Sequence, residues 1–108
     1  MEPIDFEAFS RIELRTAKVL EVHPHPDADR LYLLRIDGGD EERQIVAGIR
    51  EHYPPEELRG RTIVVVWNLA PATIRGQRSQ GMLLAVQDGE TVSILRPDRD
   101  VRPGRRVS

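Results

Sequence analysis

The chain has 108 residues, of which 39% are hydrophobic and 31% charged, and its formal net charge at pH 7 is −2. These values predict one soluble globular domain over residues 1–108 and exclude an intrinsically disordered chain. The absence of cysteine excludes cysteine-dependent catalysis and zinc sites with cysteine ligands. No apolar run approaches the roughly 18 residues that a membrane-spanning helix needs. The N-terminal residues lack a secretory pattern, so we expect a cytoplasmic protein.

The charges are unevenly distributed along the chain. Residues 1–69 carry 9 basic and 14 acidic residues, whereas residues 70–108 carry 7 arginines and 4 acids. We place the beginning of this basic excess at the polar connection around residues 70–78. Clustered basic residues favour phosphate binding more than net charge does. The alternative is a solvated surface of uneven sign.

The first elements are a short helix and a long strand. Residues 3–9 predict a helix that Asp5 caps. Residues 12–22 predict a strand whose apolar positions change phase twice, which indicates a bulge or a sharp bend. Residues 23–29, "HPHPDAD", form a loop because two prolines deny it regular structure.

Four more strands follow. The predicted elements are strands 30–37 and 42–49 joined by a turn at 38–40, helical turns within 53–60, strands 61–69 and 79–86, a turn at 88–89, and a strand at 91–95 before a closing segment. A long first strand and a small helix between the third and fourth strands match the OB-fold. We therefore predict an all-β, five-stranded OB-fold barrel with short helices and a C-terminal strand extension.

Ligands of this fold lie on strands 2 and 3 and between the loops that join strands 1–2 and 4–5. Those loops are residues 23–29 and 70–78 here. The connection within "NLAPATIRGQRSQGMLLA", residues 68–85, is longer than a chain reversal requires. We interpret it as a binding surface for RNA. Strands 30–37 and 61–69 are apolar on both faces, so the C-terminal strand or a second subunit must cover part of the barrel.

At Ser79-Gln80-Gly81-Met82 the chain resembles the tRNA-binding domain family. Further matching segments are "LRTAKVLEVHPHPDADRLYLLRID", "RQIVAGI", "YPPEEL", "NLAP", "IRG" and "PDRDV". The family includes stand-alone tRNA-binding proteins and the C-terminal domain of bacterial methionyl-tRNA synthetases. The resemblance implies a non-enzymatic, homodimeric OB-fold protein without cofactor or metal. It further implies binding to the outer corner of the L-shaped tRNA by shape more than by sequence, with a synthetase as a possible partner.

The resemblance also implies which residues contact RNA. The predicted RNA-binding residues are Arg30, Asn68, Arg75, Arg78, Ser79, Gln80 and Met82. Of these, Arg78 is not part of the family pattern. Arginines suit phosphates, and the polar side chains suit sugars and base edges. Met82 suits an unstacked base, or else it belongs to the core. We expect Arg75, Arg78 and Ser79 to face solvent.

The glycines and the departures from the family pattern bear on the same surface. We expect Gly76 to help hold the loop open and Gly81 to admit an RNA backbone. The family usually has several basic residues after Asn-Leu and an acid before Ser-Gln-Gly-Met. This chain has Ala70, Ala72 and Thr73 after Asn-Leu, and Arg78 before Ser79.

Three alternatives remain open. A metal site or hydrolase would use His23, His25, Asp27 and Asp29, but alternate positions in a proline-kinked loop need not converge. We assign both histidines to an exposed loop. A secretion chaperone of the same fold would bind unfolded polypeptide. An adaptor would dock onto a synthetase and deliver tRNA to it. For the homodimer we expect contacts from residues 53–60 and from the region around Ile94 and Val101.

Overall fold

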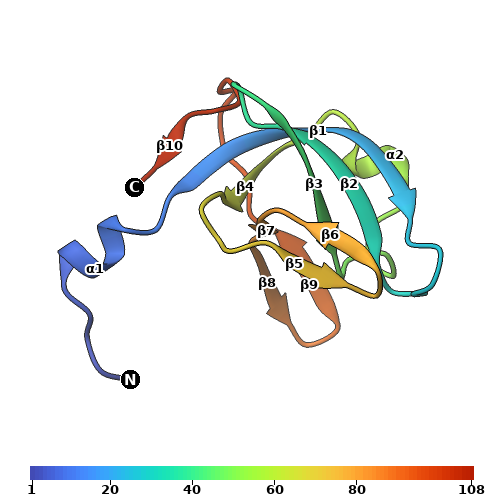
Figure 1. Cartoon of the computed structure of the whole chain (residues 1–108), viewed down its shortest axis with the longest axis horizontal. Coiled ribbons are helices and arrows are strands. Elements are labelled where there is room, and N and C mark those ends of the chain that lie inside the picture. The colour runs from blue at the N-terminus through green and yellow to red at the C-terminus, as the bar shows by residue number, and fades with distance from the viewer.

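The computed structural model describes residues 1–108 and shows a strongly curled sheet with the order β3-β2-β1-β4-β7 (Figure 1). The prediction of an all-β, OB-like barrel is confirmed. The elements are α1 (Phe6–Ser10), β1 (Leu14–Pro24), β2 (Tyr32–Asp37), β3 (Glu42–Ala47), α2 (Pro55–Leu58), β4 (Thr62–Val66), β5 (Ala72–Ile74), β6 (Gln77–Ser79), β7 (Met82–Leu83), β8 (Ala85–Asp88), β9 (Thr91–Ile94) and β10 (Arg106–Val107).

Strand β1 is the centre of the barrel because it pairs with three strands. It lies antiparallel to β2 along its second half, to β4 along its first half, and to β10 at its start. The register with β2 shifts between Val19 and Glu21, so the predicted bulge is confirmed. A bulge increases the local twist of a strand. That twist allows β1 to pair with strands in both halves of the curled sheet.

The core lies inside this curled sheet. Burial alternates with a period of two in β2, so its alternate residues point inward. In β1 and β4 the core-facing residues are Ala17, Val19, Val22, Ile63 and Val65. The largest fully buried side chains are Leu34, Ile36, Ile45, Leu58, Ile63, Val19 and Val65. Leu58 comes from α2, so this short helix packs on the core and closes one end of the barrel.

The C-terminal segment covers the outer face of β1 and β4. Thr16 is buried, and its hydroxyl donates to the carbonyl of Arg102 at 2.7 Å and accepts from the amide of Arg105 at 2.9 Å. The buried Val64 lies on the same outer face, opposite the inward-facing Ile63 and Val65. For β4, one of the two strands predicted to be apolar on both faces, the cover is the chain's own C-terminal segment.

Residues 68–86 differ from the prediction. The expected open loop contains a hairpin, in which β5 pairs with β6 from Ala72↔Ser79 to Ile74↔Gln77. The predicted fifth strand 79–86 is wrong as one element: Ser79 ends β6, and β7 and β8 are separate strands interrupted at Leu84. Strand β8 turns at Asp88-Gly89 into β9, as predicted.

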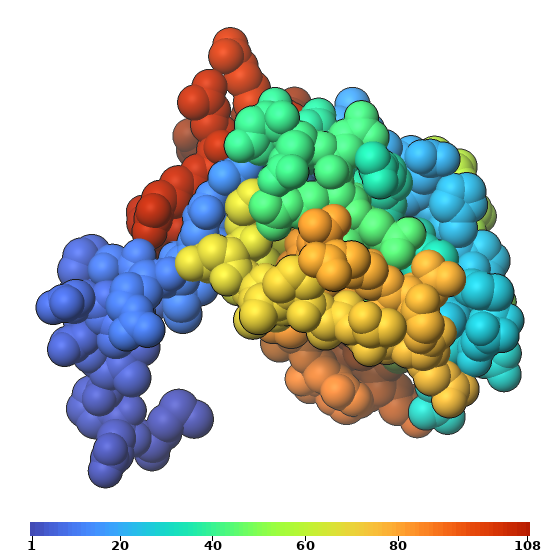
Figure 2. Space-filling view, viewed as in Figure 1, coloured from blue at the N-terminus to red at the C-terminus, as the bar shows by residue number.

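Residues 1–12 extend away from the barrel as an N-terminal arm (Figures 1 and 2). The arm contains α1, and the Asp5 carboxylate caps it by accepting from the amide of Ala8 at 2.8 Å, as predicted. None of the residues of α1 is buried. No helix of the structure is both long and apolar enough to cross a membrane.

Candidate nucleic-acid interface

The β5–β6 hairpin ends in a two-residue turn formed by Arg75 and Gly76. Arg75 has φ 53° and Gly76 has φ 84°, and the flanking Ile74 and Gln77 are paired. Two central residues with positive φ are the hallmark of a type I′ turn, which favours Asn-Gly. An arginine in this conformation costs about 1 kcal/mol. Gly76 therefore closes a tight turn and does not hold a loop open, and the Arg75 side chain projects from the hairpin tip.

The hairpin is tied to the loop between β1 and β2 through His25. The imidazole is 2% exposed, its Nδ1 accepts from the amide of Asp27 at 3.0 Å, and its Nε2 lies 3.1 Å from the carbonyl oxygen of Ile74. Since Nδ1 accepts, Nε2 carries the proton and donates to Ile74. The expectation that His25 is exposed is wrong, because the ring is buried and both of its nitrogens are bonded to backbone groups. His23 is exposed, as expected, and lies 3.3 Å from Glu21.

A second contact joins the same two loops. The Arg75 guanidinium donates to the carbonyl of Asp27 at 3.1 Å. Arg30 follows in the same loop; it is exposed and pairs with Glu51 at 2.8 Å. Arg78 is exposed on β6, and its guanidinium makes no hydrogen bond or ion pair within the protein. The loop of residues 25–31 and the hairpin thus form one continuous surface that carries three exposed arginines.

Ser79 is placed differently from the prediction. Its side chain is buried, with 4% exposure, and its hydroxyl accepts from the amide of Val46 at 2.9 Å and donates to the carbonyl of Gly81 at 3.0 Å. The expectation that Ser79 faces solvent is wrong. Its hydroxyl instead satisfies an amide of β3 that the short β6 leaves without a ladder partner. Ser79 therefore anchors the base of the hairpin.

The surroundings of Gly81 also differ from the prediction. A Cβ on this residue would lie 3.0 Å from the carbonyl oxygen of Val66 and 3.2 Å from a methyl of Val65. Its φ of 131° is one that residues with side chains rarely adopt. The space beside Gly81 is filled by β4, so the glycine serves the packing of the chain rather than the approach of an RNA backbone.

Gln80 continues the attachment of the hairpin to β3. Its amide donates to the carbonyl of Gln44 at 2.9 Å, and the Gln44 side chain donates to the carbonyl of Arg78 at 2.9 Å. The Gln80 side chain makes no hydrogen bond and is half-buried. It remains available to a ligand.

Asn68 connects the start of the hairpin connection to the N-terminal arm. Its Oδ1 accepts from the amide of Glu13 and its Nδ2 donates to the carbonyl of Arg11, both at 2.7 Å. Both bonds are to backbone groups, so the Asn68 side chain is engaged within the protein. The sequence around Asn68 does not indicate this role, because the partner groups on Glu13 and Arg11 lie more than 50 residues away in the chain.

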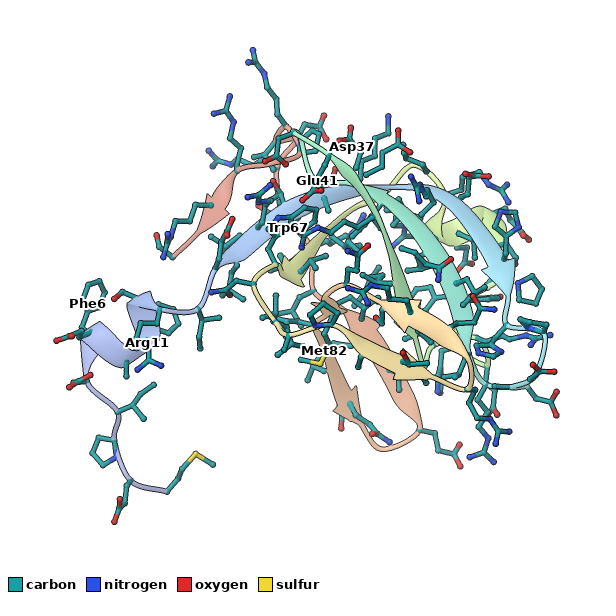
Figure 3. All side chains as sticks on the ribbon, viewed as in Figure 1. Phe6, Arg11, Asp37, Glu41, Trp67 and Met82 are labelled. Atoms are coloured by element: carbon teal, nitrogen blue, oxygen red, sulfur yellow. The ribbon has the colours of Figure 1, made fainter.

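Met82 is 46% exposed, so it does not belong to the core. It lies at the start of β7, beside the hairpin (Figure 3). Its thioether lines an apolar groove between the barrel and the N-terminal arm. The lining residues are Ala8, Arg11, Ile12, Val66, Asn68, Leu69 and Met82.

Trp67, which was not among the predicted site residues, holds the chain in place where it leaves β4. The ring is buried, and the guanidinium carbons of Arg43 and Arg15 lie 3.8 Å and 4.4 Å from its centroid. Arg43 also donates to the carbonyl of Trp67 at 2.7 Å. Burial disfavours the charged form of Arg15, but hydrogen bonds and charge from Glu13 and Asp40 outweigh it and raise the pKa of Arg15 above its usual value. Arg15 is therefore a cation at neutral pH, and its guanidinium stacks on the indole in that form.

The geometry does not support a metal site at His23, His25, Asp27 and Asp29. No group of three or more histidine, aspartate or glutamate side chains gathers closely enough to hold an ion. The two ring nitrogens of His25 are engaged as described, which leaves no lone pair free for a metal.

The distribution of charge needs one correction. Residues 70–94, which include the hairpin, carry two arginines and two acids, whereas residues 95–108 carry five arginines and two acids. The basic excess therefore belongs to the C-terminal segment and does not begin at residues 70–78. The hairpin contributes individual exposed arginines rather than a strong positive field.

Comparisons with known proteins identify the family. Residues 14–106 match the model of the putative tRNA binding domain. A methionine–tRNA ligase of Thermococcus kodakarensis is 50% identical over 107 residues, which cover 99% of this chain but 14% of that protein. The structure resembles a MetRS-related protein from Pyrococcus horikoshii, with TM-score 0.93, 34% identity and full coverage of both chains. It also resembles the chaperone CsaA from Bacillus anthracis, with TM-score 0.88 and 30% identity over 99% of this chain and 100% of that one. The chain thus belongs to the tRNA-binding domain family.

Proposed function

We propose that the chain is a non-catalytic, cytoplasmic module that binds tRNA at its outer corner, by shape rather than by sequence. The binding surface is the joined surface of residues 25–31 and the β5–β6 hairpin. The observation that carries the proposal is the pair of contacts between these loops, His25 to Ile74 and Arg75 to Asp27. They hold together the two loops at which OB-folds bind oligonucleotides.

The exposed side chains on this surface have the chemistry that RNA requires. Arg30, Arg75 and Arg78 are exposed and suit phosphates. Gln80 suits a sugar or a base edge, and the flexible Met82 suits an unstacked base. Asn68 and Ser79 act indirectly, since their side chains bond to backbone groups that position the hairpin.

Homodimer formation is part of the proposal. The N-terminal arm exposes Ile4 and Phe6, and the Phe6 ring lies on the side of α1 that faces away from the barrel (Figure 3). Apolar side chains on an extended arm favour burial against a partner. The groove lined by Ile12, Leu69 and Met82 offers a complementary apolar surface for the arm of a second copy.

The predicted dimer contacts are revised accordingly. Ile94 is buried in the core of its own barrel, so its side chain is not offered to a partner from the predicted region around Ile94 and Val101. Leu58, within the predicted segment 53–60, is fully buried as well. Val101 is exposed, but it lies among the arginines of the C-terminal segment, so the revised interface is the arm and its groove alone.

Light scattering tests the dimer. We expect twice the chain mass of 12.3 kDa at micromolar concentration. Phe6→Ser should shift the mass toward the monomer, whereas Val86→Ser, which changes an exposed apolar residue of β8, should not. A monomeric parent protein contradicts the dimer but not RNA binding.

Two other functions have specific support. The structural similarity to a chaperone, which extends over the full length of that protein, supports binding of unfolded polypeptide. The relatives named as methionine–tRNA ligases support an association with a synthetase, either as part of one chain or as a docked adaptor. The adaptor is compatible with tRNA binding, whereas the chaperone is a separate function.

A fluorescence anisotropy titration separates these functions. Labelled bulk tRNA, duplex DNA and a permanently unfolded polypeptide are each titrated with the protein at several salt concentrations. We expect tRNA to bind most tightly and to weaken steeply as salt rises, because counterions are released from phosphates. If the polypeptide binds more tightly than tRNA and its binding does not change with salt, the chaperone function is favoured and the tRNA-binding proposal is contradicted.

A further inference from the structure

A second basic surface lies away from the hairpin, on the C-terminal segment. Residues 95–108 contain five arginines, and β4 is preceded by another, Arg61. Arg96, Arg99 and Arg105 are exposed and Arg61 is half-buried. We call these four residues, Arg61, Arg96, Arg99 and Arg105, the C-terminal arginine surface. The functional site described above uses none of them.

The backbone that carries these arginines is firmly attached to the barrel. Thr16 bonds to the segment at four points, through its amide, its carbonyl and its hydroxyl, which meets both Arg102 and Arg105. The amide of Gly104 donates to the Thr16 carbonyl at 2.7 Å. Strand β10 then pairs with the start of β1. The arginines are thus displayed from fixed positions on the outer face of β1 and β4, which lowers the entropic cost of binding a ligand.

The arginines surround two adjoining depressions. The first, of about 230 Å³, is lined by Gly60, Arg61, Thr62, Arg96, Pro97, Arg99, Asp100 and Val101. The second is lined by Thr16, Val64, Arg96, Pro97, Val101, Arg105, Arg106 and Val107. Arg96 belongs to both. The guanidinium groups therefore lie in a row along one continuous concave surface.

These guanidinium groups have no partner within the protein. Arg61, Arg96, Arg99 and Arg105 form no side-chain hydrogen bond and no ion pair, although Asp100 lines the first depression. Four other arginines, by contrast, each pair with an acid: Arg15, Arg30, Arg35 and Arg43. Five donors in a planar fork favour an oxyanion such as a phosphate.

We propose that the C-terminal arginine surface binds phosphate groups of an RNA backbone, as a contact region separate from the hairpin. The proposal rests on the proposed function in taking RNA as the ligand. A polymer fits better than a single small anion, since the depressions are open, adjoin each other and share Arg96. Contacts of this kind add affinity without reading sequence.

The test is the salt dependence of tRNA binding by the full chain with Arg96→Ala and Arg99→Ala combined. Two lost phosphate contacts should reduce the slope of log affinity against log salt by about 1.4–1.8. Affinity near 0.1 M salt should fall about tenfold or more. The matched control is Arg96→Lys with Arg99→Lys, which keeps both charges and should keep the slope. Thermal unfolding should be unchanged in both variants, since the two side chains are exposed.

A comparison with Arg75→Ala plus Arg78→Ala separates the two proposals. If the hairpin variant loses affinity and the Arg96/Arg99 variant binds tRNA like the parent, the C-terminal surface is not an RNA contact and tRNA binding through the hairpin stands. If neither variant changes tRNA binding, both proposals fail. If the Arg96/Arg99 variant loses binding only to an acidic polypeptide, the surface recognises protein and the RNA assignment is overturned.

Discussion

His25 and Ile74, 49 positions apart in the chain, are joined by a hydrogen bond of 3.1 Å from the imidazole Nε2 to the backbone carbonyl oxygen. This bond, with that between Arg75 and Asp27, makes one surface of two loops that belong to different halves of the barrel. The relative position of the arginines on these loops depends on it. Stability and tRNA binding should therefore both respond to His25.

Replacing His25 with alanine should lower the free energy of unfolding by about 1–3 kcal/mol, because a buried ring is removed and the carbonyl of Ile74 and the amide of Asp27 lose their partner. Binding of tRNA should weaken in a folded variant, since the two loops separate. The control is His23→Ala, which removes an exposed ring and should change neither property. Urea unfolding and anisotropy measure the two effects. Equal stability of both variants would contradict the role of His25.

Ser79→Ala should destabilise the protein by about 1–3 kcal/mol, because the amide of Val46 is left unsatisfied in the interior. The salt slope of tRNA binding should remain that of the parent, since no charge is removed. Ser93→Ala, on the exposed face of β9, is the matched control and should be neutral. A Ser79→Ala variant as stable as the control would show that the hydroxyl does not anchor the hairpin.

Arg75→Asn and Arg75→Ala should separate backbone strain from charge. Both remove the guanidinium, so both should weaken tRNA binding equally. Asparagine tolerates positive φ better than alanine, so Arg75→Asn should be the more stable variant by about 0.5–1 kcal/mol. Thermal unfolding compares them. Indistinguishable stabilities would argue against the positive-φ turn at Arg75-Gly76.

Gly38→Ala should disturb the packing of Trp67. An added Cβ would lie 2.1 Å from the indole Cη2 and cannot be accommodated without moving the ring. We expect a loss of about 1–3 kcal/mol, as for other overpacked cores. Gly48→Ala is the control, because its Cβ would make only an ordinary contact with Leu31 at 3.7 Å. Similar stability of the two variants would contradict the close packing of Trp67 against Gly38.

Much of the barrel could be predicted because its strands carry local patterns. The change of apolar phase in residues 12–22 indicates the bulge between Val19 and Glu21, and Asp88-Gly89 indicates the β8–β9 turn. The β5–β6 hairpin could not be predicted in this way, since three-residue strands show no periodicity and Arg75 is an unusual residue for positive φ.

The parts of the site that sequence misplaced depend on distant partners. Ser79 is buried because of Val46, and His25 because of Ile74, and neither partner is adjacent in the chain. Five of the seven arginines in residues 70–108 lie in residues 95–108, so the positive charge belongs to the C-terminal segment rather than to the hairpin. Packing of residues 102–105 on Thr16 gathers the unpaired arginines on another face.

The measurement that tests tRNA binding by the hairpin most directly is the salt slope of the Arg75→Ala plus Arg78→Ala variant. Each lost phosphate contact should reduce the slope of log affinity against log salt by about 0.7–0.9. We therefore expect a slope shallower by about 1.4–1.8 than that of the parent, and an unchanged slope for Arg75→Lys plus Arg78→Lys. A variant whose salt dependence runs parallel to that of the parent, with equal affinity, would contradict the assignment of the hairpin as the tRNA-binding surface.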